Sequence, residues 1–260
     1  MLGAIAGDII GSVYEWHNIK TTEFPLFSGN SRFTDDTVLT VALADAVLTG
    51  APYAEKLKEY YRLYPRAGYG GRFSRWASSG ESAPCNSYGN GSAMRTSPAG
   101  WACDTLDETL SAAERFAAVT HNHPEGIKGA QSVSAAIYLA RTGSSKKEIK
   151  DYIGRMFSYD LSRTLEAIRP GYRFDVSCQG SVPEAVIAFL ESTGYEDAVR
   201  KAVSLGGDSD TIACITGGIA EAFYGPVPDD IARKALALLD TRLRDVVTRF
   251  TEQYITTRRR

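Results

Sequence analysis

Two short acidic motifs each run straight into a segment without charged side chains, and no other feature constrains the fold as strongly. Residues 34–37 (Thr-Asp-Asp-Thr) precede the uncharged run 38–44, and residues 207–211 (Gly-Asp-Ser-Asp-Thr) precede the uncharged run 212–220. A helix that is apolar all round is typical of the interior of a protein. We therefore expect two central helices, each with two carboxylates at its N-terminus.

Helical patterns also dominate the rest of the chain. We predict helices over residues 36–49, 53–64, 105–119, 124–142, 181–192, 195–204, 209–224 and 229–255, the last with a break near Asp240. In the helix over 181–192, Ser181 is expected as the cap, Pro183 in the first turn and Glu184 at the capping-box position. No clean two-residue alternation indicates a long strand. The sequence predicts an all-α fold.

Size and charge limit the classes of function. The chain has 260 residues, of which 43% are hydrophobic, and this predicts one large domain over residues 1–260. The net charge of −2 gives no support for non-specific binding to nucleic acid or to a membrane surface. The basic triplet at 258–260 is predicted to be a solvated chain end.

The cysteines and the N-terminus indicate the compartment. Four cysteines lie far apart and form no Cys-x-x-Cys pair, which disfavours a zinc ribbon and suits a reducing cytoplasm. The N-terminus lacks a basic segment and Asp8 interrupts its apolar stretch, so it is a poor signal peptide. No apolar run reaches the roughly 18 residues of a membrane span. We expect a cytoplasmic protein.

The acidic motifs have two interpretations. Asp35 and Asp36 would diverge as neighbours, whereas Asp208 and Asp210 would point to one side of an extended segment. With hydroxyl oxygens from the adjacent threonines, the four carboxylates suit a pair of Mg²⁺ or Mn²⁺ ions, while zinc is disfavoured. The alternative is helix capping, which needs only one acceptor per helix. Metal binding and capping have about even odds from spacing alone.

Other segments carry polar groups in loops. Glycines in residues 67–71 and 86–91 would let a ligand approach backbone amides closely, and a helix start near Ser92 would favour an anion. Glu15 stands between two aromatic residues and is either an exposed carboxylate at a helix end or a general acid or base with a raised pKa. His121 and His123 are too few for a zinc site, and one of them is expected to contact a ligand phosphate or to cap the helix from Pro124.

These segments together resemble the ADP-ribosylglycohydrolase family, also called ADP-ribosyl-acceptor hydrolases. The motifs are residues 6–8 (Ala-Gly-Asp) with 11–12 (Gly-Ser), residues 34–37, residues 89–95 (Gly-Asn-Gly-Ser-Ala-Met-Arg) and residues 206–211 (Gly-Gly-Asp-Ser-Asp-Thr). The resemblance covers essentially the whole chain. It implies an orthogonal multi-helix bundle with two Mg²⁺ or Mn²⁺ ions in a central cleft, and hydrolysis of the bond that joins ADP-ribose to an acceptor.

The resemblance also implies the roles of individual residues. The implied metal ligands are Thr34, Asp35, Asp36, Asp208, Asp210 and Thr211. The implied substrate-binding residues are Gly68, Gly70, Gly71, Ser87, Tyr88, Gly89, Asn90, Gly91 and His121. Catalysis would use Glu15, Asp35 and Asp36, without a fixed division between general acid and general base.

Residues 13–17 (Val-Tyr-Glu-Trp-His) look like a stretch of the branch that acts on serine-linked ADP-ribose, poly(ADP-ribose) and O-acetyl-ADP-ribose. Asn86 departs from this branch, which tends to have glycine there. The expected reaction is cleavage at C1 of the distal ribose through an oxocarbenium-like transition state. Its substrate would be ADP-ribose linked to a protein or an acetyl group. Three alternatives stay open: an arginine-linked ADP-ribosyl hydrolase, a non-catalytic ADP-ribose binder and a two-metal phosphohydrolase of nucleotide diphosphates.

Overall fold

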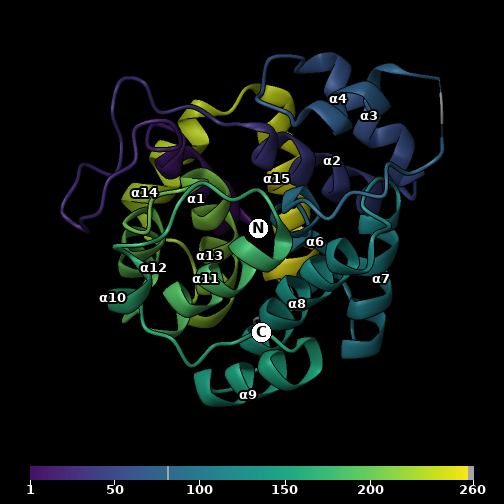
Figure 1. The fold of residues 1–260 in the computed structure, drawn as a ribbon. Helices are drawn as coiled ribbons and strands as arrows, with labels where there is room; N and C mark the ends of the chain where they lie inside the picture. Colours follow the sequence, from purple (N-terminus) through teal and green to yellow (C-terminus); the bar gives the residue numbers. More distant parts are fainter. Residues whose placement is uncertain (81, 257–260) are drawn as a thin grey trace.

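The computed structural model describes residues 1–80 and 82–256, and in this part of the chain the fold is helical (Figure 1). Its only strand-like feature is an isolated antiparallel bridge between Gly89 and Ser177. The all-α prediction is confirmed, whereas the basic triplet at 258–260 lies outside the described residues. No described helix is both long and apolar enough to cross a membrane.

The helices follow one another as α1 (Leu2–Gly11), α2 (Asp35–Thr49), α3 (Tyr53–Leu63), α4 (Gly71–Ser78), α5 (Gly91–Met94), α6 (Ser97–Ala102), α7 (Leu106–Ala118), α8 (Pro124–Arg141), α9 (Lys146–Phe157), α10 (Leu165–Ile168), α11 (Cys178–Leu190), α12 (Tyr195–Val203), α13 (Ser209–Tyr224), α14 (Asp229–Leu238), α15 (Thr241–Phe250) and the π-helix η1 (Thr251–Thr256).

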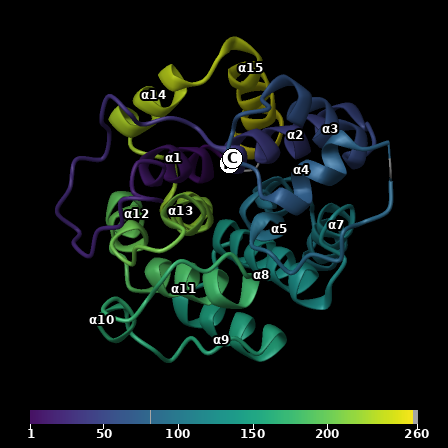
Figure 2. The ribbon, with the colours of Figure 1, turned by 45° about the horizontal axis from the view of Figure 1, so that its top comes forward.

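The two apolar segments form the central helices that the sequence predicts. Nearly every residue of α13 is buried, and α1, α8, α11 and α12 all pack against it. Figure 2 shows α13 almost end-on, with α1, α11 and α12 around it. The first two-thirds of α2 are also buried, between α1, α3, α6 and α15. The N-termini of α2 and α13 therefore lie inside the molecule.

Glycines let α1 lie directly on α13. Gly3, Gly7 and Gly11 recur every four residues and therefore share one face of α1. A Cβ atom on Gly7 would lie 2.1 Å from the carbonyl oxygen of Ala213, and one on Gly11 would lie 2.5 Å from Cα of Asp210. The backbones of the two helices thus approach too closely for any side chain between them. Asp8 is carried to the start of α13 by this contact.

One predicted helix start is wrong. The helix over 181–192 begins at Cys178, with Ser177 as its cap and its hydroxyl accepting from the Gly180 amide, so Pro183 lies inside the helix. The cause is tertiary. Amides and carbonyls on both sides of Ser177 pair with the segment at Tyr88–Asn90, which holds the chain extended up to the first residue of α11.

The C-terminal prediction is confirmed, and one clear helix was missed. The pattern over 229–255 divides at Asp240, whose side chain accepts from the Leu243 amide and caps α15. The prediction missed α9, although Ser145 and Glu148 form a full capping box at its start. The short helices α4, α5, α6 and α10 also escaped the periodicity argument because they contain fewer than three turns.

Replacing Gly7 by alanine should destabilise the protein strongly, because the added methyl group would clash with backbone rather than with a movable side chain. We expect a loss of about 3 kcal/mol or more, which lowers the midpoint of thermal unfolding by roughly 6–12 °C. Gly29→Ala is the matched control, since a Cβ there meets nothing within 4 Å. Equal unfolding midpoints for both variants would contradict the proposed backbone contact.

Candidate functional site

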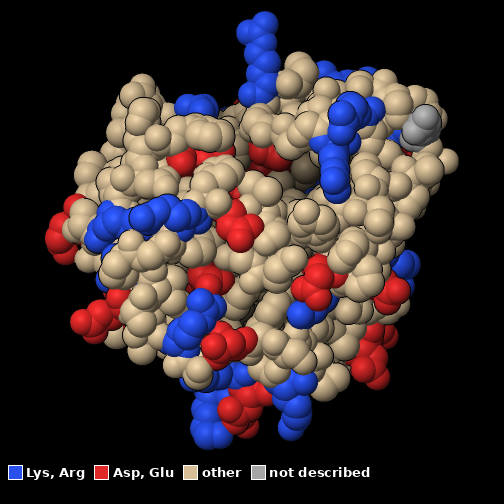
Figure 3. Space-filling model, viewed as in Figure 1, with Lys and Arg blue, Asp and Glu red and all other residues tan. Residues whose placement is uncertain are grey.

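A cavity of about 540 Å³ opens where the N-termini of α2 and α13 meet the glycine-rich loops. Its lining includes Glu15, Asp35, Asp36, Asp208, Asp210, Thr211 and the loop residues Gly68, Gly70, Gly71, Ser87, Tyr88, Gly89, Asn90, Gly91 and His121. Figure 3 shows this hollowed face, with acidic side chains inside the hollow and basic side chains beside it. The cavity has the size of a pocket for a small organic ligand.

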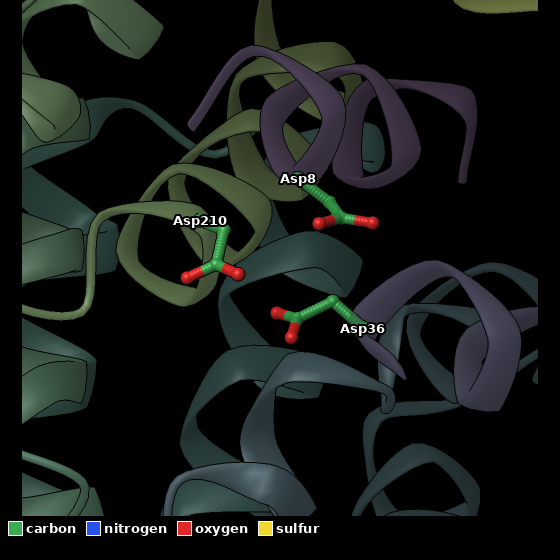
Figure 4. A group of neighbouring side chains, drawn as sticks. All are labelled: Asp8, Asp36 and Asp210. Carbon is green, nitrogen blue, oxygen red and sulfur yellow. The ribbon is translucent and has the colours of Figure 1, made fainter. Parts of the chain in front are cut away.

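The carboxylates of the two acidic motifs converge on the floor of this cavity. Oxygens of Asp36 and Asp210 lie with one of Asp8 within 4.8 Å of one another, and Glu15, Asp208 and Asp210 form a second such group. Figure 4 shows the first three side chains pointing toward a common space from α2, α13 and α1. The acidic motifs, about 170 residues apart in the chain, therefore build one site.

Helix capping explains only part of this arrangement. Thr34 caps α2, since its hydroxyl accepts from the Asp36 amide at 3.4 Å. Asp208 stands at the N-cap of α13 but accepts no capping hydrogen bond from that helix. Its carboxylate accepts instead from the side-chain amide of Asn90 at 2.7 Å. The carboxylates of Asp208 and Asp210 therefore face the cavity, and Asp208 does not cap α13.

Adjacent Asp35 and Asp36 diverge, as their spacing predicts. A Cβ atom on Gly68 would lie 3.3 Å from Oδ1 of Asp35, so this carboxylate faces the loop 67–71. The φ of +107° at Gly68 explains why glycine is needed in that loop. The hydroxyl of Thr211 donates to Asp36 at 3.3 Å. Among the predicted ligands, only Thr34 is absent from the described lining of the cavity, because its hydroxyl donates to Asp8.

Crowding of buried carboxylates shifts their pKa values upward. Burial first and the charge of Asp210 second raise the pKa of Glu15 to about 7. Burial also raises the pKa of Asp208 to about 6. The pKa values of Asp35, Asp36 and Asp210 lie well above the usual range, because burial and neighbouring carboxylates both disfavour their charged forms. Without a cation, the protein can hold this site only partly ionised.

The donor set fits divalent cations. Oδ1 of Asp36 is buried and finds no hydrogen-bond partner among the described residues. An unpartnered buried carboxylate oxygen is costly in a folded protein. A cation bound by Asp36 and Asp210 would satisfy this oxygen, and a second cation beside Glu15, Asp208 and Asp210 would neutralise the rest of the cluster. Carboxylate and hydroxyl oxygens without cysteine or histidine ligands suit Mg²⁺ or Mn²⁺.

The second loop, residues 86–91, also lines the cavity. Its backbone pairs with the segment before α11, where the Asn90 amide donates to Val176 and the Cys178 amide donates to Tyr88. Asn86 has a φ of +48°, a conformation that asparagine tolerates better than most residues. The loop is thus fixed by its own hydrogen bonds, and Asn90 joins it to the carboxylate of Asp208.

His121 presents a neutral ring to this loop. Arg95 donates to the Thr120 hydroxyl at 2.7 Å, and that hydroxyl lies 2.7 Å from Nδ1 of His121. Arg95 also lies 3.5 Å from Nδ1, which favours a lone pair on this nitrogen and the proton on Nε2. Burial first, then the charge of Arg95, lowers the pKa of His121 well below its usual value. A Cβ atom on Gly91 would lie 3.3 Å from Nε2, so the N–H borders the glycine loop.

His123 has the capping role that the sequence allowed. Its Nδ1 accepts from the Glu125 amide at 3.1 Å and caps α8. The two histidines therefore have different functions.

Several residues of the site escaped the sequence prediction. Asp8 is fully buried beside the acidic motifs, and its carboxylate in an apolar helix was the available signal. Arg95 lines the cavity and was noted only as the end of a motif. Trp16 and Phe174 stack with ring centroids 5.3 Å apart at the cavity mouth. Only the fold brings the loop with Phe174 to the residue that follows Glu15.

A family model described as ADP-ribosylglycohydrolase matches residues 1–260. The chain belongs to the ADP-ribosylglycohydrolase family. A solved structure described as "ADP-ribosylglycohydrolase-related protein complex" matches with a TM-score of 0.73 and 24% identity over 96% of each chain, which supports the same fold. The family and the fold class inferred from the sequence are confirmed, as is the expectation of a hydrolase.

Curated relatives include proteins of animals, of a bacterium and of an archaeon. The alignment with "ADP-ribosylhydrolase ARH3" of Homo sapiens is 305 positions long and has 27% identity. It covers 86% of this chain and 84% of the relative. The chain is 25% identical to "ADP-ribosylarginine hydrolase Tri1" of Pseudomonas putida over 257 residues, covering 86% of this chain and 69% of the relative. The first similarity agrees with the branch that residues 13–17 indicate.

In the cation-free protein, Glu15 and Asp208 should contribute more stability as the pH falls from 8 to 5, while His121, whose pKa is lowered in the folded state, opposes them below its usual pKa. The pKa values of Glu15 and Asp208 are raised in the folded state, to about 7 and about 6. The stability that these groups contribute is present at low pH and is lost as the pH rises through those values. Mn²⁺ at 100 times its dissociation constant should add about 2.7 kcal/mol at pH 8, or roughly 5–10 °C, and much less at pH 5.

Thermal unfolding with EDTA or Mn²⁺ at both pH values measures this effect. Asp210→Asn should reduce the Mn²⁺-induced shift. Asp230→Asn, an exposed acid at the start of α14, should leave the shift unchanged. The interpretation is wrong if Mn²⁺ stabilises the protein equally at both pH values, or if both variants respond as the wild type does.

Proposed function

We propose that the protein is a metal-dependent ADP-ribosyl hydrolase that cleaves the bond between C1 of the distal ribose of ADP-ribose and an O-linked acceptor. One observation carries the proposal. In a member of this family, buried carboxylates of Asp36, Asp208 and Asp210 converge, with an unpartnered oxygen, on a cavity walled by glycine-rich loops. Two Mg²⁺ or Mn²⁺ ions are the cofactors that this donor set favours.

The residues of the cavity divide into two functional groups. Asp35, Asp36, Asp208, Asp210 and Thr211 would hold the cations at the reacting end, with Thr34 as a further predicted ligand. Bound Mg²⁺ or Mn²⁺ supplies positive charge that polarises hydroxyls and water. Backbone amides around Gly68, Gly70, Gly71 and Ser87–Gly91 would hold the diphosphate, in loops that also reach the carboxylates through Gly68 and Asn90. Fixing the substrate at both ends would hold C1 near the carboxylates.

Glu15 is the residue that we propose to carry the catalytic proton. Its pKa of about 7 lets it hold or release a proton near neutral pH. One of its oxygens lies within 4.8 Å of oxygens of Asp208 and Asp210. In its neutral form it can protonate the leaving oxygen, and in its charged form it can take the proton of the attacking water. Asp35 and Asp36 are the alternative bases.

His121 would recognise the diphosphate without a charge of its own. Its Nε2–H borders Gly89 and Gly91, and the neutral form is favoured by burial and by Arg95. Binding of ADP-ribose should therefore not require protonation of this histidine near neutral pH.

Two relatives bear on the acceptor linkage that we propose. The human relative carries the name ADP-ribosylhydrolase ARH3, and the Pseudomonas relative carries the name ADP-ribosylarginine hydrolase. Together with residues 13–17, the first relation supports serine-type, O-acetyl or poly(ADP-ribose) linkages. The second relation makes an arginine linkage the alternative. A cytoplasmic location remains a proposal from the cysteine pattern.

A panel of substrates with serine, arginine, O-acetyl and nucleic-acid-end linkages tests the reaction. We expect release of intact ADP-ribose from an O-linked substrate in Mg²⁺ or Mn²⁺, and none in EDTA. AMP and ribose phosphate as products would instead indicate a phosphohydrolase. Tight ADP-ribose binding without turnover of any substrate would support a non-catalytic binder and contradict the proposal.

Two substitutions test the roles of the carboxylates. Glu15→Gln should lower kcat by about 10²- to 10⁴-fold without lowering the unfolding midpoint. Asp210→Asn should cost at least as much activity, because it removes a member of both carboxylate groups. Asp230→Asn serves as the control with unchanged activity. Full activity of Asp210→Asn would exclude the proposed ligand set, and parallel losses of activity and stability in Glu15→Gln would make Glu15 a structural residue.

A further inference from the structure

Asp8 lies in the carboxylate group with Asp36 and Asp210, but its environment differs from theirs. It is fully buried, while the other two line the cavity. Asp8 is not among the described residues that form that lining. A substrate or solvent molecule in the cavity therefore reaches Asp36 and Asp210 without touching Asp8.

The carboxylate of Asp8 is held by four hydrogen bonds from the start of α2. Thr34 donates to Oδ2 through its amide at 2.9 Å and to Oδ1 through its hydroxyl at 2.7 Å. Thr37 donates to Oδ2 through its amide at 3.2 Å and also through its hydroxyl. Both lone pairs of Oδ2 are therefore engaged, and both oxygens are tied to α2. Asp36 is the opposite case, because its Oδ1 has no partner among the described residues.

These four hydrogen bonds enclose the first acidic motif. Thr34 and Thr37 flank Asp35 and Asp36 at the first turn of α2, where backbone amides lack partners inside the helix. A negative charge at this helix end is also favoured by the helix dipole. Holding the chain on both sides of the acidic pair fixes the direction in which the Asp36 side chain leaves the helix.

The same residue joins α2 to the helix that carries Asp210. Asp8 follows Gly7, which lies against the backbone of Ala213, and the next glycine of that face, Gly11, lies against Asp210 itself. The position of Asp8 relative to α13 is therefore set by backbone contact. Through its hydrogen bonds to Thr34 and Thr37, Asp8 connects the start of α2 to the helix pair α1 and α13.

We propose that Asp8 is a positioning residue: through its hydrogen bonds to Thr34 and Thr37 it holds the N-terminus of α2 so that Asp36 faces Asp210 across the cation site. The proposal rests on the metal site of the proposed function. It gives Asp8 a role different from that of Asp36 and Asp210, which are the proposed cation ligands of the same carboxylate group. Outer residues that orient metal ligands change affinity by about 10- to 100-fold when replaced.

The test measures binding of Mn²⁺ alone, by electron paramagnetic resonance or calorimetry, well below the unfolding temperature. Thr37→Val removes one donor to Asp8 and leaves its carboxylate in place. We expect Mn²⁺ affinity to fall roughly 3- to 10-fold in Thr37→Val and about 10- to 100-fold in Asp8→Asn. If Asp8 acted only as a ligand through Oδ1, which Thr37 does not contact, Thr37→Val would leave Mn²⁺ affinity unchanged.

Thr40→Val is the matched control. Thr40 lies one turn further along α2, is equally buried, and donates to the Met94 carbonyl instead of to Asp8. Its Mn²⁺ affinity should equal that of the wild type. An equal loss in Thr37→Val and Thr40→Val would make the effect a general loosening of α2 and overturn the proposal. If Asp8→Asn does not fold, Thr37→Val and Thr40→Val still decide the question.

The result also separates this proposal from the proposed function. If the wild type binds no Mn²⁺, the metal-dependent function fails, and the positioning role fails with it. If the wild type binds Mn²⁺ and Thr37→Val binds it equally well, only the positioning role of Asp8 is overturned.

Discussion

Repulsion among buried carboxylates is the constraint on which the site depends. Asp36, Asp208 and Asp210 line one cavity because two apolar helices begin beside it, and Asp210 belongs to both carboxylate groups there. Their raised pKa values express first the cost of burying the charged carboxylates and then the cost of placing like charges close together. A protein with this arrangement gains stability from any cation that binds among the carboxylates. The repulsion that makes the cation-free site unfavourable therefore favours the binding of a cation.

The glycine face of α1 makes this arrangement sterically feasible. Because Gly7 and Gly11 leave no room for side chains, α1 lies on α13 at backbone distance. Asp8 is thereby placed where it can accept hydrogen bonds from both threonines that flank Asp35 and Asp36. Asp8 thus links the packing of α1 on α13 to the start of α2.

Much of the fold follows from the sequence because its main signals are local. The two uncharged segments predict α2 and α13, and the capping role of Asp240 predicts the break between α14 and α15. The start of α11 could not be predicted, because a bridge to Gly89 decides it. Short helices such as α4 also lack enough turns to show a period.

The candidate site can also be predicted from the sequence only in part. The acidic motifs and glycine loops were identified from residue types, and the structure brings them to one cavity. The role of Asp8 could not be read from the chain, because its four donors lie about 26 to 29 residues away. The neutral state of His121 likewise depends on Arg95, which approaches only in the folded protein. Contacts between distant residues thus determine what single residues of the site can do.

The most direct test of the metal site is anomalous scattering from crystals grown with Mn²⁺. We expect manganese peaks in the cavity within coordination distance of Asp36, Asp208 and Asp210, one of them bonded to Oδ1 of Asp36. Manganese bound elsewhere on the protein, with no peak among these three carboxylates, would contradict the account.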